Sequence, residues 1–253
     1  MTPLAAAAGV EVETLALVRE GWRGRAAVAR VPASRYSALA LDVDRWLGPI
    51  ERRTFDAFEY ERRRTSYLLG RCAAKAALSA LAAPVGVEAH TLDVVAGCFQ
   101  QPVIRGAWPL PLGVSISHAM TVAYAVAFPD EHPMAIDVEE IDAARAEVMK
   151  TQLTPREIDA LRTLGDSVTL TVVAWTAKEA LSKALRCGMT VPFDLLEVHQ
   201  LCGESDTFTG TFPSFAQYRF ESRVRDGAVV TLVLPKKTVA IPEKQVTDVA
   251  ATD

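Results

Sequence analysis

Residues 134–139, Met-Ala-Ile-Asp-Val-Glu, predict a β-strand around which the rest of the chain can be arranged. Successive side chains of a strand point to opposite faces, so Asp137 and Glu139 share one face while Ile136 and Val138 share the other. Two carboxylates held this close raise each other's pKa unless a cation lies between them. Hard oxygen ligands in this arrangement suit Mg²⁺, and Mn²⁺ is an acceptable substitute.

A predicted helix can supply a third carboxylate. Residues 168–185 are patterned as one long helix, which contains the segment Trp-Thr-Ala-Lys-Glu-Ala-Leu-Ser-Lys at 175–183. Glu179 and Lys183 are four residues apart, so an acid and a base project from the same helix face about one turn apart. Glu179 can therefore complete a metal site with the two carboxylates of the strand.

The composition is that of a globular protein. Because its net charge is negative, any binding of phosphate groups must depend on a local cluster of basic residues. The chain has 253 residues, of which 50% are hydrophobic, and fits one large domain or two small ones. A net charge of −4 argues against a general nucleic-acid binder. Four scattered cysteines without a C-x-x-C pair favour reduced thiols in the cytoplasm. The start lacks the basic segment of a signal peptide, and no apolar run approaches the ~18 residues of a membrane span.

The order of patterns along the chain predicts an α+β fold. Residues 51–81 show helical spacing of apolar and basic side chains, and Thr-Pro-Arg-Glu at 154–157 forms a capping box at which another helix begins. Asp226-Gly227 is typical of a hairpin turn between two late strands. The expected strands besides the one at 134–139 are residues 13–18, 91–96, 114–118, 122–128, 216–224 and 229–234.

A linker and a short repeat suggest two halves. Residues 129–133 begin and end in proline, which divides the chain into residues 1–130 and 131–253, with a polar and frayed tail beyond Pro235. Ala-Lys-Ala-Ala-Leu-Ser at 74–79 matches Ala-Lys-Glu-Ala-Leu-Ser at 177–182. If the match is not chance in an alanine-rich chain, only the second half carries the metal carboxylate, and the cleft lies between the halves.

Basic and hydroxyl side chains offer a second candidate site. Arg71 and Lys75 lie four residues apart on the 51–81 helix and could bind an anion, although a solvated helix face is the alternative. Ser117 and His118 end a predicted strand, where their donors could meet a phosphate or a carbonyl. A structural histidine is the alternative there.

These segments resemble four motifs of the Sfp-type 4′-phosphopantetheinyl transferases, which move phosphopantetheine from coenzyme A to a serine of a carrier protein. Residues 135–139 are similar to the family's G-[IV]-D-[IV]-E strand, and residues 175–183 to its W-[ST]-x-K-E-[AS]-x-x-K helix. Residues 115–118 are similar to its N-x-S-H segment, and residues 69–75 to its G-R-x-x-x-[RK] helix. The resemblance implies a pseudo-dimer of two similar α+β halves with the active site in the cleft between them.

The resemblance also implies roles for individual residues. Mg²⁺ on the coenzyme A pyrophosphate would be held by Asp137, Glu139 and Glu179. Glu179 and Lys183 are the implied catalytic residues, and Lys183 would contact the phosphates. The nucleotide end of coenzyme A would be held by residues of the first half: Arg71, Lys75, Ser117 and His118.

Two departures from the family's motifs affect the nucleotide side. Ser115 replaces an asparagine, and Gln100-Gln101-Pro102 stands where many members have G-K-P. One lysine contact is therefore missing, and Arg53 and Arg63 are the candidates to replace it.

The implied activity is a Mg²⁺-dependent transfer to an apo acyl or peptidyl carrier protein by a cytoplasmic monomer. A binding module without turnover, for coenzyme A or a carrier protein, is the alternative from another class. A Mg²⁺-dependent phosphohydrolase or nucleotidyltransferase loses support because neither G-x-x-x-x-G-K-[ST] nor G-x-G-x-x-G occurs. We expect the carrier to dock on residues 142–161, through the charges of Arg145, Lys150 and Arg156 or through the apolar side chains of Val148, Met149 and Leu153.

Overall fold

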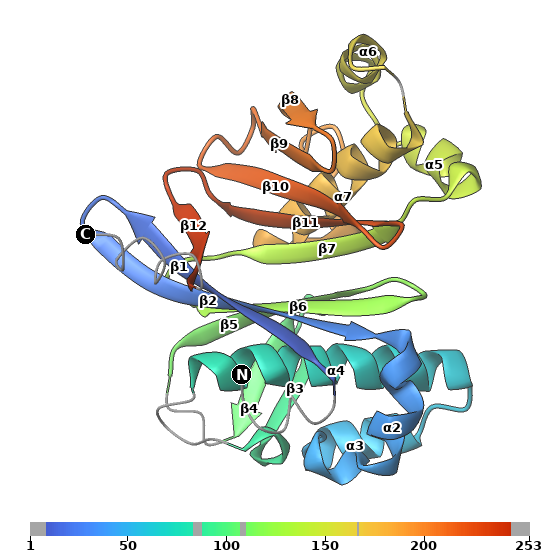
Figure 1. Ribbon diagram of the computed structural model, residues 1–253, viewed down its shortest axis with the longest axis vertical. Helices are drawn as coiled ribbons and strands as arrows, with labels where there is room; N and C mark the ends of the chain where they lie inside the picture. Colours follow the sequence, from blue (N-terminus) through green and yellow to red (C-terminus); the bar gives the residue numbers. More distant parts are fainter. Residues whose placement is uncertain (1–8, 83–87, 107–109, 166, 244–253) are drawn as a thin grey trace. The chain divides into compact units, whose positions relative to one another are not determined.

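The computed structural model describes residues 9–82, 88–106, 110–165 and 167–243, and the chain divides into two compact units (Figure 1). Unit 1 comprises Met1–His132 and Lys237–Asp253, and unit 2 comprises Pro133–Lys236. Both units pack helices on antiparallel sheets, so the predicted α+β class is confirmed. The division falls within the expected linker, whereas the residues after Lys236, which we assigned to the second half, belong to unit 1.

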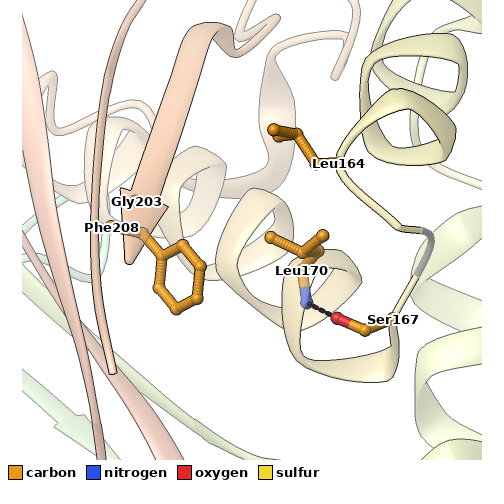
Figure 2. Close-up of a pocket in the computed structure, with 5 residues that line it drawn as sticks. All are labelled: Leu164, Ser167, Leu170, Gly203 and Phe208. Atoms are coloured by element: carbon orange, nitrogen blue, oxygen red, sulfur yellow. Dashed lines mark hydrogen bonds between the residues drawn. The ribbon is translucent and has the colours of Figure 1, made fainter. Parts of the chain in front are cut away.

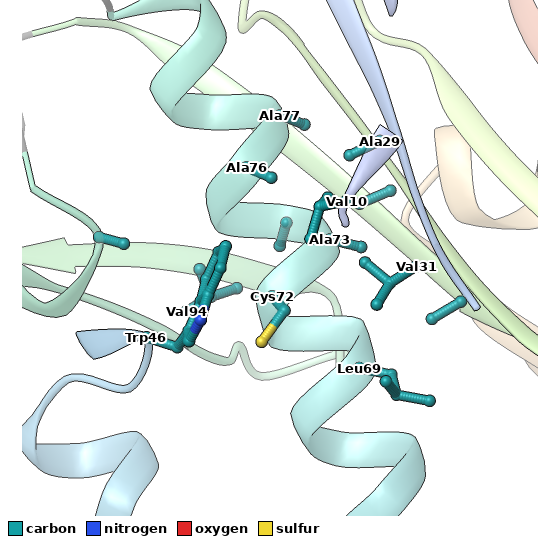
Figure 3. Packing of buried hydrophobic residues seen from close by; sticks show 14 of the residues in the cluster. Val10, Ala29, Val31, Trp46, Leu69, Cys72, Ala73, Ala76, Ala77 and Val94 are labelled. Atoms are coloured by element: carbon teal, nitrogen blue, oxygen red, sulfur yellow. The ribbon is translucent and has the colours of Figure 1, made fainter. Parts of the chain in front are cut away.

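Unit 1 is built around α4 (Glu61–Leu81), which packs on a five-stranded sheet. Figure 3 shows Ala73, Ala76 and Ala77 of this helix gathered with Ala29 and Val31 in one buried cluster. Small side chains on both surfaces allow the helix backbone to approach the sheet closely. The strands, in spatial order, are β12 (Val239–Pro242), β1 (Glu11–Arg19), β2 (Trp22–Pro32), β6 (Val122–Pro129) and β5 (Leu112–His118).

The single helix predicted over residues 51–81 is two helices. α3 (Pro49–Asp56) ends before Tyr60, whose extended backbone begins α4. Residues 57–60 contain no glycine or proline, so the break has no local signal in the sequence. The remaining elements of unit 1 are the short helix α2 (Tyr36–Leu41) and a two-stranded sheet of β3 (Leu92–Ala96) and β4 (Pro102–Gly106).

Unit 2 places α7 (Val168–Ala184) against the first two strands of an antiparallel sheet. Asp226 and Gly227 both have positive φ, 51° and 75°, and form the predicted hairpin turn. The other helices are α5 (Ala143–Lys150) and α6 (Pro155–Thr163). The strands, in spatial order, are β7 (Ala135–Glu140), β11 (Ala228–Pro235), β10 (Tyr218–Arg225), β9 (Thr207–Thr211) and β8 (His199–Glu204).

The same local topology occurs in both units. In unit 1, β2 pairs with β6 and β6 with β5, and α4 covers them. In unit 2, β7 pairs with β11 and β11 with β10, and α7 packs on this set. The six-residue repeat of the sequence lies on α4 and on α7, so it has a structural counterpart.

The predicted frayed tail is wrong for its first part. β12 pairs with β1 from Val18 opposite Val239 to Leu15 opposite Pro242, because an edge strand offers unpaired backbone groups. Residues 244–253, and residues 1–8 on which the expectation about a signal peptide rests, lie outside the described residues. Among the helices that the structure describes, none combines the length and apolarity needed to cross a membrane.

Candidate active site

The structure brings the predicted residues of β7 and α7 together. The Lys183 ammonium lies 2.6 Å from Asp137 Oδ1 and donates to the Ile136 carbonyl at 3.5 Å. Asp137 is buried, with 3% of its surface exposed. Glu179 lies one turn before Lys183 on the same helix. The alternation of the strand and the four-residue spacing of the helix therefore bring Asp137 into contact with Lys183 and place Glu139 and Glu179 within range of the charge of Asp137.

The carboxylates of this cluster disturb one another's protonation. Burial, followed by the charge of Asp137, raises the pKa of Glu179 to about 7, against the opposing effect of Lys183. Burial and the charge of Asp137 also raise the pKa of Glu139, which Arg145 opposes. Such coupling requires carboxylates that lie close together with little water between them. The cluster therefore favours an added cation.

Two cations of the protein already contact these carboxylates. Lys183 binds Asp137, and Arg145 Nη2 of α5 lies 2.6 Å from Glu139 Oε2. The Arg145 side chain is 47% exposed. The sequence analysis placed Arg145 on a surface for the carrier protein, and the structure places it at the edge of the carboxylate cluster.

The donor set fits a divalent metal ion in chemistry, although its present geometry does not form a ligand sphere. Within the described ranges, no three His, Cys, Asp or Glu side chains lie close enough together to hold one metal ion. Asp137 and Glu139 turn toward Lys183 and Arg145 instead. Metal binding would require these carboxylates to exchange their present partners for the ion. Three carboxylates, two of which have a pKa raised by burial and by the charge of Asp137, suit Mg²⁺ in number and in kind.

The predicted nucleotide-side residues lie in unit 1. Arg71 stacks its guanidinium 4.5 Å from the Tyr67 ring centroid, and its side chain is 17% exposed. His118 is exposed at the end of β5, next to the buried Ser117. Two further arginines are exposed on α3 and α4: Arg53 and Arg63.

Lys75 corrects one prediction. Its side chain is fully buried, and its ammonium lies 2.5 Å from Glu51 Oε2. It also donates to the carbonyls of Ala89 at 2.9 Å and Leu92 at 2.6 Å. A lysine ammonium has three protons, and these contacts use all of them. The prediction that Lys75 holds coenzyme A is therefore wrong. The ammonium is fully engaged within the protein, where it links α4 to α3, to Ala89 and to the start of β3.

Comparison with known families adds an independent observation. The family model described as the 4′-phosphopantetheinyl transferase superfamily (ACPS) matches residues 133–233. Through unit 2, the chain is therefore similar to the 4′-phosphopantetheinyl transferase superfamily. The match includes β7 and α7, and with them the four clustered residues.

One solved structure of this superfamily is similar to part of the chain. It is a holo-(acyl-carrier-protein) synthase from Bacillus anthracis str. Ames in complex with CoA (3′,5′-ADP). The two sequences are 22% identical, and the similarity covers 45% of this chain and 96% of that one, with a TM-score of 0.37. No curated protein matches the chain.

Within the superfamily segment, sequence reasoning missed a buried ion pair between α6 and α7. Lys178 Nζ lies 2.6 Å from Glu157 Oε2, and both side chains are at most 2% exposed. The predicted capping box of Glu157 with Thr154 is confirmed, but its second partner was not foreseen. The repeat could have indicated it, because Lys178 occupies the position of Lys75. Lys178 also donates to two backbone carbonyls, those of Gln152 and Phe193.

A separate pocket of the transferase segment lies between the α6–α7 connection and the β8–β9 hairpin (Figure 2). Ser167 accepts a hydrogen bond from the Leu170 amide at 3.2 Å and caps α7 there. The described lining contains none of the predicted site residues and is mostly apolar, so it has no part in the carboxylate chemistry. It consists of Leu164, Ser167, Leu170, Gly203 and Phe208.

Proposed function

We propose that the protein is a Mg²⁺-dependent, Sfp-type 4′-phosphopantetheinyl transferase. It transfers the phosphopantetheine of coenzyme A to a serine of an apo acyl or peptidyl carrier protein and releases 3′,5′-ADP. The observation that carries this proposal is the cluster of Asp137, Glu139, Glu179 and Lys183 inside the segment that matches the superfamily. A cytoplasmic monomer is part of the proposal.

In this transfer, the serine oxygen bonds to the β-phosphorus as the bond from that phosphorus to the bridging oxygen of 3′,5′-ADP breaks. Asp137, Glu139 and Glu179 would hold Mg²⁺, which would supply positive charge to the reacting phosphate groups. The Lys183 ammonium, 2.6 Å from Asp137 in the structure, stabilises the charge that develops on the leaving oxygen.

The serine must lose its proton during attack. Glu179, whose pKa is raised to about 7, is suited to accept that proton near neutral pH. The same carboxylate is a proposed metal ligand, and the charge of Asp137 acts on it. Coenzyme A itself is held on the unit 1 side by Arg71, Ser117 and His118, with Arg53 and Arg63 in place of the lysine missing at Gln101.

A binding module without turnover is disfavoured by the half-buried carboxylates of Glu139 and Glu179. Burial raises the pKa of Glu139 and Glu179, so keeping both ionised costs free energy that simple binding does not require.

The test is a mass spectrum of apo carrier proteins after incubation with the protein, coenzyme A and Mg²⁺. We expect a mass increase of one phosphopantetheine, which is absent in EDTA and absent when Asp137→Ala replaces the parent. If acyl and peptidyl carriers all keep their mass while coenzyme A still binds to the protein, a binding module without turnover is the better description.

A further inference from the structure

Three buried hydroxyls connect α7 to the sheet beside the carboxylates. Ser222 of β10 lies 2.7 Å from Thr231 of β11, and Thr231 lies 2.6 Å from Thr176 of α7, measured between side-chain oxygens. The exposed fraction of each residue is 0%. We call these three residues the hydroxyl chain.

The direction of the hydrogen bonds in the hydroxyl chain follows from counting protons. Thr176 donates its proton to the Val173 carbonyl at 3.1 Å. A hydroxyl has one proton to donate, so Thr231 must donate to Thr176, and Ser222 must donate to Thr231. Each donor is satisfied, and the series ends on a backbone carbonyl of α7.

The hydroxyl chain joins the elements that carry the carboxylates. Thr231 is the cross-strand partner of Asp137, so their side chains stand on one face about 5 Å apart. Thr176 precedes Glu179 by three residues and is its neighbour on the helix surface. The hydroxyl chain therefore links the position of Asp137 on the sheet to the position of Glu179 on α7.

The corresponding positions of unit 1 carry no hydroxyl. Ala73 of α4 precedes the repeat position Ala76 as Thr176 precedes Glu179. On the sheet, Ala125 pairs with Ala29 and with Ile116, as Thr231 pairs with Asp137 and Ser222. At these compared positions unit 1 thus has apolar side chains, so this contact between helix and sheet does not require the hydroxyls.

We infer that Ser222, Thr231 and Thr176 are positioning residues that hold Glu179 opposite Asp137 against the repulsion of the two carboxylates. This inference rests on the proposed function, in which these carboxylates bind the metal. Lys183 also ties α7 to Asp137, but in the proposed transfer it contacts the phosphates. The hydroxyl chain then remains as a direct polar link between α7 and the strands β10 and β11.

Two variants separate positioning from stability. Thr231→Val has nearly the parent's shape and leaves the Ser222 proton buried without an acceptor, so its melting temperature should fall most. Ser222→Ala with Thr231→Val removes that orphaned donor and should recover part of the loss. If the hydroxyl chain positions Glu179, both variants should weaken Mn²⁺ binding to a similar extent. We expect the Kd measured by titration calorimetry to rise about tenfold.

Two controls sharpen the comparison. Thr231→Ser keeps the hydroxyl and should retain the parent's Kd for Mn²⁺. Thr238→Val removes a buried hydroxyl of unit 1, bonded to His132 Nε2 at 2.7 Å, and should lower the melting temperature without changing that Kd.

A double variant that binds Mn²⁺ as tightly as the parent would overturn the positioning role and leave the proposed function standing. A parent protein that binds no Mn²⁺ would overturn both, and this outcome is seen before any variant is compared.

Discussion

In unit 1, Glu51 in the first turn of α3 meets Lys75 of α4; in unit 2, Glu157 in the first turn of α6 meets Lys178 of α7. Each glutamate also accepts a hydrogen bond from a backbone amide downstream, at 2.8 and 2.7 Å. Each lysine donates to two backbone carbonyls. The two units therefore fix their central helix by the same buried ion pair.

The units differ where the central helix meets the sheet. Unit 1 has Ala76 and Ala29 at positions where unit 2 has Glu179 and Asp137. The ion pair thus belongs to the fold that the units share, whereas the carboxylates belong to the chemistry of unit 2 alone. Substitutions that exchange the two kinds of residue should separate these contributions.

The largest effect is expected from giving unit 2 the residue of unit 1. Asp137→Ala should abolish transfer, because the remaining carboxylates lose a metal ligand and Lys183 loses its partner. The fold should persist, since removing one of several repelling carboxylates relieves strain. Transfer is measured by carrier mass, and circular dichroism measures the fold. A variant that transfers at nearly the parent's rate would remove Asp137 from the metal site.

The next largest effect concerns the shared ion pair. Lys178→Met leaves the buried Glu157 without Lys178, and Lys75→Met leaves the buried Glu51 with only Arg71 Nε at 3.5 Å. Each should cost about 3–5 kcal/mol of unfolding free energy. Urea unfolding measures the loss. Adding Glu51→Gln to Lys75→Met, or Glu157→Gln to Lys178→Met, should restore much of it. A loss in one unit alone would show that the two pairs are not equivalent.

The same comparison tests the correction for Lys75. In Lys75→Met, measured where it is folded, the Kd for coenzyme A should stay near the parent's value, because the Lys75 ammonium is buried against Glu51 and two backbone carbonyls. Glu51 is left unchanged in this test because it also lies 3.5 Å from Arg71 Nε. If Arg71 binds a phosphate, Arg71→Ala should instead raise the Kd for coenzyme A by roughly ten- to a hundredfold. If the Lys75 variant and Arg71→Ala raise the Kd for coenzyme A equally, Lys75 does bind coenzyme A and the correction is wrong.

A smaller effect is expected from Glu179 on stability. Its folded-state pKa of about 7 exceeds the ordinary 4.5, so the folded state loses stability as pH rises from about 4.5 through 7. Glu179→Gln cannot ionise and avoids this loss. In EDTA it should raise the unfolding free energy by roughly 1–3 kcal/mol at about pH 8 and change little at about pH 4.5. Glu204→Gln on the exposed strand β8 controls for the loss of one charge; an equal gain there would reject the interpretation.

Most of the correct predictions from the sequence came from patterns among neighbouring residues. The strand of Asp137, the helix of Glu179 and the turn at Asp226 depend on alternation, helical spacing and turn chemistry, which neighbouring residues determine. The ion pair of Lys75 with Glu51 joins two helices, and its burial depends on β3, which lies farther along the chain. Helical spacing placed Lys75 on a face with Arg71 but could not show which of them the fold would cover. β12 was missed for the same reason, because its partner β1 is more than two hundred residues away.

The smallest effect is expected at the surface where we propose that the carrier docks. Val148 is 69% exposed, whereas Met149 and Leu153 are buried, so the apolar alternative is reduced to Val148. Arg145 contacts Glu139 of the proposed metal site, and reversing its charge would disturb that site, so Lys150 and Arg156 are the charges to reverse. Attraction between exposed charges is screened within about 10 Å at 0.1 M salt, so it should act on the encounter with the carrier.

We therefore predict that salt raises the KM for an acidic carrier protein severalfold with little change in kcat. Lys150→Glu with Arg156→Glu should raise KM at low salt and abolish the salt dependence, while Val148→Ala should leave that dependence intact. Arg162→Glu, at the other end of α6, controls for a reversed charge elsewhere on the surface. If the doubly reversed variant keeps the parent's KM at low salt, the carrier does not dock through these charges, and a raised KM in Val148→Ala alone would assign docking to the apolar contact.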